Sequence, residues 1–191
     1  MHWFPDYNYI LASGSPRRQI LLKSLGIDFK VDIKEVEESF PENMAKEKIP
    51  VFLAEMKAEP FLAELTKKDL LITADTIVWL NGKVLGKPDN EEEARRMLHS
   101  LSGRKHKVIS GVCLSSCRKQ KSFYAVSDVH FKILSDHEID YYIFAYKPYD
   151  KAGAYGIQEW IGYIGITHIE GSFYNVMGLP VQKLYTEILC F

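Results

Sequence analysis

The fold is decided by the stretch Tyr9-Ile10-Leu11-Ala12-Ser13-Gly14-Ser15-Pro16-Arg17-Arg18-Gln19-Ile20-Leu21-Leu22-Lys23-Ser24-Leu25. Its apolar, β-favouring start leads through small residues to Ser15-Pro16, where serine suits the N-cap of a helix and proline suits its first turn. Ile20, Leu21 and Leu25 then provide an apolar helix face. The stretch therefore predicts a strand, a tight turn and a helix.

Two arginines stand at the start of this predicted helix. Arg17 and Arg18 follow the proline where the helix dipole already presents positive partial charge, although a purely structural helix prefers Asp or Glu there. Backbone N–H groups, the hydroxyls of Ser13 and Ser15 and two guanidinium groups suit a dense anion such as a polyphosphate. The competing interpretation is a structural turn with solvated arginines, because neither standard glycine-rich nucleotide loop is present.

The composition is that of one packed globular domain over residues 1–191, or of two small lobes that share a core. The formal net charge is −1, so no nucleic-acid partner is expected and any anion site must be local. Three cysteines without a Cys-x-x-Cys pair and the lack of an export signal predict free thiols and a cytoplasmic location. No apolar run is long enough to span a bilayer, so no membrane partner is expected.

One acid lies inside the strongly apolar, β-rich run of residues 70–80. Burying an ionised carboxylate without a partner is costly, so Asp75 is expected to be paired, bound to a metal, or at a strand break that faces a cleft. A functional Asp75 is favoured over a structural one. The dipeptide Asn81-Gly82 that follows predicts a two-residue type I′ hairpin turn.

Periodicity and capping predict the flanking elements. A strand is expected over residues 29–36, and a helix over residues 51–65 with a bend at Pro60. Lys57 lies on that helix, where an exposed lysine is the simpler interpretation. The acidic segment between these two elements is typical of a solvated loop, although one of its carboxylates, Glu38, could bind a metal.

The second half of the chain continues the alternation of helices and strands. Strands are expected over residues 108–114 and 123–134, and a capping box at Ser135 opens a helix whose apolar face points inward. Two glycine-rich stretches, residues 150–158 and 171–180, predict a backbone that passes close to another backbone or to a ligand.

Four stretches together resemble the Maf family of nucleoside triphosphate pyrophosphatases: residues 11–18, 74–76 with 86–88, 150–158 and 171–180. They occur in the expected order over nearly the whole chain. The resemblance implies an α/β fold, with a mixed twisted sheet, flanking helices and two lobes around a central cleft, similar to that of the inosine-triphosphate pyrophosphatases. It also implies that a homodimer hydrolyses a nucleoside triphosphate to the monophosphate and pyrophosphate with a divalent cation, Mg²⁺ or Mn²⁺.

The resemblance also implies a substrate class. Gly156-Ile157-Gln158 is similar to the subgroup that acts on dTTP and UTP, whereas the subgroup that acts on 7-methyl-GTP has Glu in place of the Gln. On this likeness, Arg17, Thr76 and Gln158 fall on positions associated with base choice, and Asp75 falls on the proposed proton acceptor.

The same resemblance places Glu38, Lys57 and Lys87 near the triphosphate. The implied mechanism has the arginines hold the β- and γ-phosphates, while the two lysines neutralise the leaving pyrophosphate. A metal held by Asp75, with Glu38, would activate the water that attacks the α-phosphorus. Whether Asp75 is the base or a metal ligand stays open. Lys147 departs from the family pattern, since many relatives have Glu there.

The implied hydrolysis of dTTP and UTP would be a house-cleaning activity, and two alternative functions remain beside it. The family is also described as septum-formation inhibitors, so the chain could be a nucleotide-binding regulator of cell division. A regulator would not need Asp75, and the complete acid-and-base set favours an enzyme. The second alternative is a pyrophosphatase for 7-methyl-GTP or other modified triphosphates.

Overall fold

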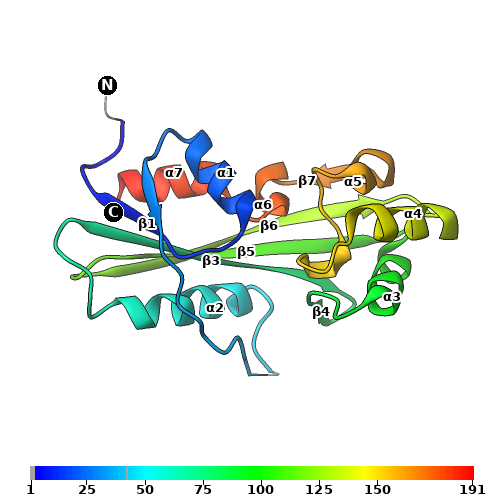
Figure 1. Cartoon of the computed structure of the whole chain (residues 1–191), viewed down its shortest axis with the longest axis horizontal. Coiled ribbons are helices and arrows are strands. Elements are labelled where there is room, and N and C mark those ends of the chain that lie inside the picture. The colour runs from blue at the N-terminus through cyan, green and yellow to red at the C-terminus, as the bar shows by residue number, and fades with distance from the viewer. Residues whose placement is uncertain (1–2, 42) are drawn as a thin grey trace. The chain divides into compact units, whose positions relative to one another are not determined.

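The computed structural model describes residues 3–41 and 43–191 (Figure 1). Within these ranges no helix is both long and apolar enough to cross a membrane. The elements in chain order are β1 (Asn8–Leu11), α1 (Pro16–Ser24), β2 (Phe29–Val31), α2 (Lys48–Ala58), the 3₁₀ turn η1 (Glu59–Phe61), β3 (Asp69–Leu80), β4 (Lys83–Leu85), α3 (Glu91–Leu101), β5 (Lys105–Ser115), β6 (Gln120–Phe131), α4 (Asp136–Tyr146), the 3₁₀ turn η2 (Ala152–Ala154), α5 (Trp160–Gly165), β7 (Ile166–Glu170), α6 (Phe173–Met177) and α7 (Val181–Leu189).

The strands form one seven-stranded mixed sheet in the order β2-β1-β3-β5-β6-β7, with β4 paired to β3. Strand β1 pairs in parallel with both neighbours, so that Tyr9 lies opposite Phe29 on one side and Leu70 on the other. Strands β4 and β7 pair antiparallel with β3 and β6. The predicted α/β fold with a mixed sheet and flanking helices is confirmed.

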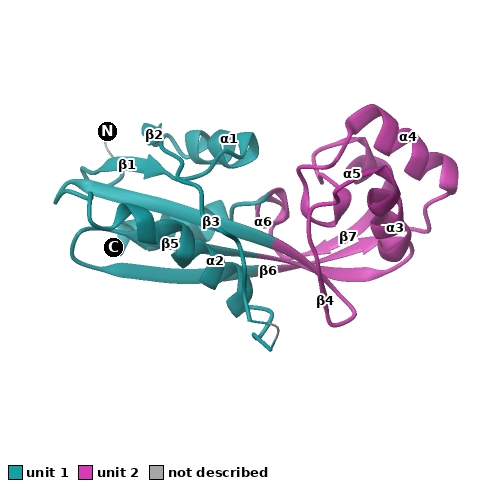
Figure 2. Cartoon of the chain, turned by 60° about the horizontal axis from the view of Figure 1, so that its bottom comes forward, with its two compact units in different colours: residues 1–76, 110–125, 178–191 teal, residues 77–109, 126–177 magenta. Residues whose placement is uncertain are grey.

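The chain divides into two compact units (Figure 2). Unit 1 consists of residues 1–76, 110–125 and 178–191, and unit 2 consists of residues 77–109 and 126–177. Strands β3, β5 and β6 contribute residues to both units. Two units agree with the two lobes that the family resemblance implies.

Helices cover both faces of the sheet in unit 1, with α1 and α7 on one face and α2 on the other (Figure 1). Helix α2 packs through two small residues, Ala54 and Ala58, against β3 and β5. Its backbone lies directly on β5, because a Cβ added at Gly111 would be 2.3 Å from the backbone of Pro50. This close packing fixes the position of Lys57, which α2 carries.

The core of unit 2 is formed by α3, α4 and α5 against the sheet. Helix α4 begins with the predicted capping box, in which Ser135 and Glu138 exchange hydrogen bonds between side chain and backbone. Ile139, Tyr142 and Ile143 are buried, as the sequence predicts.

The hairpin between β3 and β4 also has the predicted form. Leu80 lies opposite Lys83, which leaves a two-residue loop. Asn81 and Gly82 have φ angles of 50° and 83°, and positive φ at both positions is the mark of a type I′ turn.

Two helix predictions are wrong in detail. Ile20 is 58% exposed, because it points away from the face that Leu21 and Leu22 bury. The helix expected over residues 51–65 begins earlier and ends before Pro60, which stands in η1. Proline lacks the N–H that would continue the α-helical hydrogen bonds.

Other predictions differ in extent. The strand expected over residues 29–36 ends at Val31, because its partner β1 ends at Leu11 and supplies no further backbone to pair with. Helix α5 and strand β7 were not expected from the sequence, and the glycine-rich stretch 171–180 contains the short helix α6.

Candidate active site

A buried ion pair joins α2 to the middle of β3. The Nζ of Lys57 lies 2.7 Å from Oδ1 of Asp75, and the two side chains are only 14% and 12% exposed. Apolar neighbours place Asp75 inside, and the ammonium group offsets the cost of burying its charge. Of the three alternatives for Asp75, a paired carboxylate, a metal ligand or a strand break that faces a cleft, the structure shows the pairing. The expectation of an exposed Lys57 is wrong, since the lysine turns toward the sheet.

The same ammonium group binds a second carboxylate. Lys57 Nζ lies 3.0 Å from Oε1 of Glu38, whose side chain is 46% exposed. Lys57 Nζ therefore contacts one oxygen of each of two carboxylates that are far apart in the sequence. The sequence predicts a solvated loop for this acidic segment, but its Glu38 belongs to the site.

Arg18 is held by three protein groups. Its Nε donates to the carbonyl of Gly178 at 3.0 Å, while its two terminal nitrogens donate to Oγ of Ser13 and Oγ1 of Thr76, each at 3.2 Å. Burial lowers the pKa of the guanidinium, and Asp75 acts in the opposite direction. Arg18 thus connects the start of α1, the middle of β3 and the segment before α7.

Ser110 is a neighbour that the sequence analysis missed. Its hydroxyl lies 2.8 Å from Oγ1 of Thr76, which also donates to the Gly178 carbonyl at 3.3 Å. A serine inside an apolar strand, next to Gly111, is the signal that could have indicated it. Gly178 has a φ of 123°, a backbone conformation that side-chain-bearing residues rarely adopt, so glycine is required where its carbonyl meets Arg18.

The loop before α1 has a different arrangement from the predicted one. Ser15 occupies the N-cap position, but its side chain makes no capping hydrogen bond among the described residues. Instead, its backbone N–H donates to Oγ of Ser13 at 3.3 Å. Arg17 is half-buried at the first turn of α1. Ser13, Ser15, Arg17 and Arg18 therefore do lie together at one end of this helix.

Two predicted site residues belong to unit 2. Lys87 is exposed in the loop between β4 and α3. This loop adjoins the glycine-rich stretch, because the N–H of Gly153 donates to the carbonyl of Gly86 at 2.9 Å. Gly153 has a φ of 68°, and a Cβ there would lie 3.0 Å from a methyl group of Val78, so both conformation and space require glycine. Gln158, at the end of that stretch, is partly buried.

Two carboxylates of the site have the oxygen donors that a divalent cation takes. In the described part of the chain, no group of three or more His, Cys, Asp or Glu residues is placed to hold a metal ion by itself. Asp75 and Glu38 are two carboxylates brought together by one lysine. Mg²⁺ commonly binds through one or two carboxylates together with substrate phosphate oxygens and water. The donor chemistry of Asp75 and Glu38 therefore fits a divalent cation.

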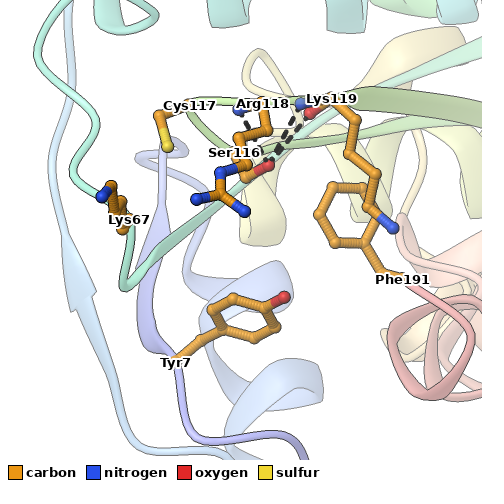
Figure 3. A pocket seen from close by; sticks show the side chains of 7 residues that line it. All are labelled: Tyr7, Lys67, Ser116, Cys117, Arg118, Lys119 and Phe191. Carbon is orange, nitrogen blue, oxygen red and sulfur yellow. Dashed lines mark hydrogen bonds between the residues drawn. The ribbon is translucent and has the colours of Figure 1, made fainter.

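Unit 1 also contains a hollow that is distinct from these residues (Figure 3). Its volume is about 420 Å³, and it is lined by Tyr7, Lys67, Phe191 and the turn residues 116–119. Within it, Nζ of Lys119 lies 4.3 Å from the centre of the Phe191 ring. None of the predicted site residues lines this hollow.

This is an α/β protein with a charged, enzyme-like site on its mixed sheet. The site contains the buried pair of Asp75 and Lys57 and the guanidinium of Arg18, which three hydrogen bonds hold in place. Within that class, the sequence pattern described as Maf-like protein matches residues 8–190. The chain belongs to the Maf-like protein family.

Several relatives carry the same name, dTTP/UTP pyrophosphatase. One from Phocaeicola vulgatus is 56% identical over 183 residues, covering 95% of each chain. One from Parabacteroides distasonis is 55% identical over 186 residues, covering 97% of this chain and 96% of its own. The solved Ham1 protein of Staphylococcus aureus has a weak likeness, with a TM-score of 0.47 and 17% identity over 65% of this chain and 71% of that one.

Proposed function

We propose that this chain hydrolyses dTTP and UTP to the monophosphate and pyrophosphate, with residues 1–191 acting as one functional domain. The observation that carries the proposal is the buried Asp75, held by Lys57 together with Glu38. The name dTTP/UTP pyrophosphatase, shared by relatives at 52–56% identity, supports the choice of reaction and substrate. The activity removes a nucleoside triphosphate from the pool, which fits a house-cleaning role.

Asp75 is the proposed catalytic residue. Water attacks the α-phosphorus, the bond from that phosphorus to the bridging oxygen breaks, and pyrophosphate leaves. Because Oδ1 of Asp75 is bound to Lys57, its other oxygen is the one that would accept the proton of the water or contact a cation. Asp75 and Glu38 would hold a divalent cation, which lowers the pKa of a bound water when present.

Cationic side chains are proposed to bind the triphosphate. Arg17, with the hydroxyls of Ser13 and Ser15, lies at the start of α1, where backbone N–H groups and the helix dipole also favour an anion. Lys57 and Lys87 would neutralise charge on the leaving pyrophosphate. Arg18 gives at least three of its N–H groups to the protein, so its proposed role includes orienting Ser13 and Thr76.

Base selection is proposed for Arg17, Thr76 and Gln158. The amide of Gln158 offers a donor and an acceptor, as the edge of uracil or thymine requires. Oε1 of Gln158 is buried without a hydrogen-bond partner among the described residues, which supports a role in accepting a hydrogen bond from a ligand.

A panel of substrates tests this proposal. Pyrophosphate release is measured with Mg²⁺ or Mn²⁺ for UTP, dTTP, CTP, GTP, ITP and 7-methyl-GTP, with EDTA as the metal-free control. We expect selective cleavage of UTP and dTTP that EDTA abolishes. Preference for a purine triphosphate would contradict the substrate class, and binding of all triphosphates without turnover would favour a regulator.

Two further predictions concern assembly and location. The family resemblance predicts a homodimer, which light scattering after size-exclusion chromatography would detect.

The cytoplasmic location is consistent with Cys113, Cys117 and Cys190, which are all free thiols. Fractionation of expressing cells tests it.

A further inference from the structure

The hydroxyl of one buried tyrosine holds both ends of the turn that carries Gln158. The N–H of Gly156 donates to the Tyr142 oxygen at 3.0 Å, and the Tyr142 O–H donates to Oε2 of Glu159. The N–H of Glu159 donates to the Gly156 carbonyl at 3.0 Å, which closes a turn with Ile157 and Gln158 at its centre. A single group of α4 therefore fixes the first and the last residue of this turn.

A buried lysine holds the other oxygen of the same carboxylate. Nζ of Lys151 lies 3.1 Å from Oε1 of Glu159 and 2.6 Å from Oδ1 of Asp150, and the lysine side chain is only 8% exposed. Burial, and then the contact with Glu159, raises the pKa of Tyr142, so its hydroxyl stays protonated and continues to donate. Contacts on both oxygens hold the Glu159 carboxylate in one orientation.

The side chain of Gln158 lies against the turn that this network fixes. A Cβ added at Gly156 would be 3.0 Å from Nε2 of Gln158 and 2.9 Å from Cδ of Glu159. Both side-chain ends therefore rest on the same glycine, whose lack of a side chain leaves room for them. Oε1 of Gln158 has no hydrogen-bond partner among the described residues, although it is buried. A buried acceptor without a donor is costly until a ligand supplies one.

We propose that Tyr142, Lys151 and Glu159 are positioning residues that fix the Gln158 amide, so that its Oε1 accepts the ring N–H of uracil or thymine. This inference rests on the proposed role of Gln158 in base selection. Cytosine presents a ring acceptor at the place where uracil presents the N–H donor, so an amide that presents its oxygen to the base rejects CTP. An amide that is free to turn would offer its N–H groups to cytosine, and discrimination would fall.

Removing one hydroxyl tests the inference. The Tyr142→Phe variant keeps the buried ring but releases both Gly156 and Glu159. We expect the ratio of kcat/KM for UTP to that for CTP to fall by about tenfold, since each lost discriminating hydrogen bond is worth about a factor of ten. The change should lie mainly in a higher KM for UTP, with kcat within about twofold. A purely structural role would lower the activity with UTP and CTP alike.

A matched control separates positioning from general loss of a buried hydrogen bond. The hydroxyl of Tyr155, in the same unit, lies 2.7 Å from Nε2 of His106, whereas that of Tyr142 lies on the Glu159 carboxylate. Tyr155→Phe should therefore reduce stability without changing the UTP:CTP ratio. Glu159→Gln, which keeps the shape of the side chain but removes the charge that Lys151 pairs with, should lower the ratio, and it decides the matter if Tyr142→Phe does not fold.

The outcomes distinguish this inference from the proposed function. If Gln158→Ala abolishes discrimination while Tyr142→Phe and Glu159→Gln keep the wild-type ratio, the positioning network is disproved and the role of Gln158 stands. If Gln158→Ala itself keeps the ratio, base selection by Gln158 is wrong, and the inference is overturned with it. A fall in the ratio for Gln158→Ala, Tyr142→Phe and Glu159→Gln, but not for Tyr155→Phe, supports both.

Discussion

Lys57 contributes to the site by holding two carboxylates with one ammonium group. The sequence could predict that Asp75 has a partner, because an unpaired charge in an apolar strand is costly. It could not identify that partner, since Lys57 lies on a different element and meets Asp75 only when α2 packs on the sheet. Ser110 was missed for the same reason, because only the fold brings its hydroxyl to Thr76.

The ion pair gives a prediction for stability. Lys57→Met should lower the free energy of unfolding by about 3 kcal/mol, because it leaves Asp75 buried without a partner. Urea denaturation followed by circular dichroism measures the change. The double variant Lys57→Met with Asp75→Asn removes the unpaired charge and should recover part of the loss. A double variant less stable than Lys57→Met alone would show that the unpaired charge is not the cause.

A buried histidine gives a prediction for pH dependence. Burial lowers the pKa of His106 from 6.5 to about 4, whereas Asp128 raises it in part. In the unfolded chain the imidazole takes up a proton near pH 6.5, so the unfolded state binds more protons between pH 6.5 and pH 4. The stabilisation from neutral His106 is therefore complete above pH 6.5 and is lost as pH falls toward 4.

Substitution of His106 should flatten this pH dependence. Between pH 7 and pH 4.5, the fall in the free energy of unfolding should be about 2 kcal/mol smaller for His106→Asn than for the wild type. Urea titrations at the two pH values measure it. His137→Asn, which changes an exposed histidine, should keep the wild-type slope. An unchanged slope for His106→Asn would contradict the depressed pKa.

At the scale of elements, the contact of α2 with β5 positions the lysine of the site. A Cβ at Gly111 would lie 2.3 Å from backbone atoms of Pro50 and Val51, and backbone cannot move aside as a flexible side chain can. Gly111→Ala should therefore lower the free energy of unfolding by about 2 kcal/mol or more and reduce pyrophosphate release, because it displaces the helix that carries Lys57. Thermal unfolding and the activity assay measure both effects.

A second glycine provides the control for this substitution. A Cβ added at Gly86 would meet no atom within 4 Å. Gly86→Ala should change the free energy of unfolding by no more than about 0.5 kcal/mol. If Gly111→Ala proved as stable as Gly86→Ala, the close packing of α2 on β5 would be wrong.

Elements with strong local signals were predicted from the sequence, and elements with weak ones were not. The turn at Asn81-Gly82 and the capping box at Ser135 depend on neighbouring residues alone, and both were confirmed. The length of β2 depends on its partner strand, which local periodicity does not reveal. Helix α5 and strand β7 follow one another without a loop between Gly165 and Ile166, so no turn residues mark their boundary.

At the scale of the whole molecule, three strands contribute residues to both compact units. Strands β3, β5 and β6 are continuous from one unit into the other. The division into two lobes followed from the family resemblance, whereas the exact residues of each unit depend on long-range contacts that no local pattern encodes. Because β3, β5 and β6 each belong in part to both units, we expect the two units to unfold together.

Hydrogen exchange along a urea titration tests this cooperativity. Peptides from α2 in unit 1 and from α3 in unit 2 should lose protection at the same urea concentration. Coincident curves for the two helices are the expected result. Two separate midpoints would show that the units unfold independently.

The most direct test of the proposed activity compares the wild type with Asp75→Asn. Pyrophosphate release from UTP with Mg²⁺ is measured beside UTP binding by calorimetry under conditions in which turnover is negligible. The Asp75→Asn variant should lose at least about a hundredfold in turnover, as expected for a general base or metal ligand, while its Kd for UTP stays within about threefold of the wild-type value. An Asp75→Asn variant that binds UTP and releases pyrophosphate at the wild-type rate would contradict the catalytic role of Asp75.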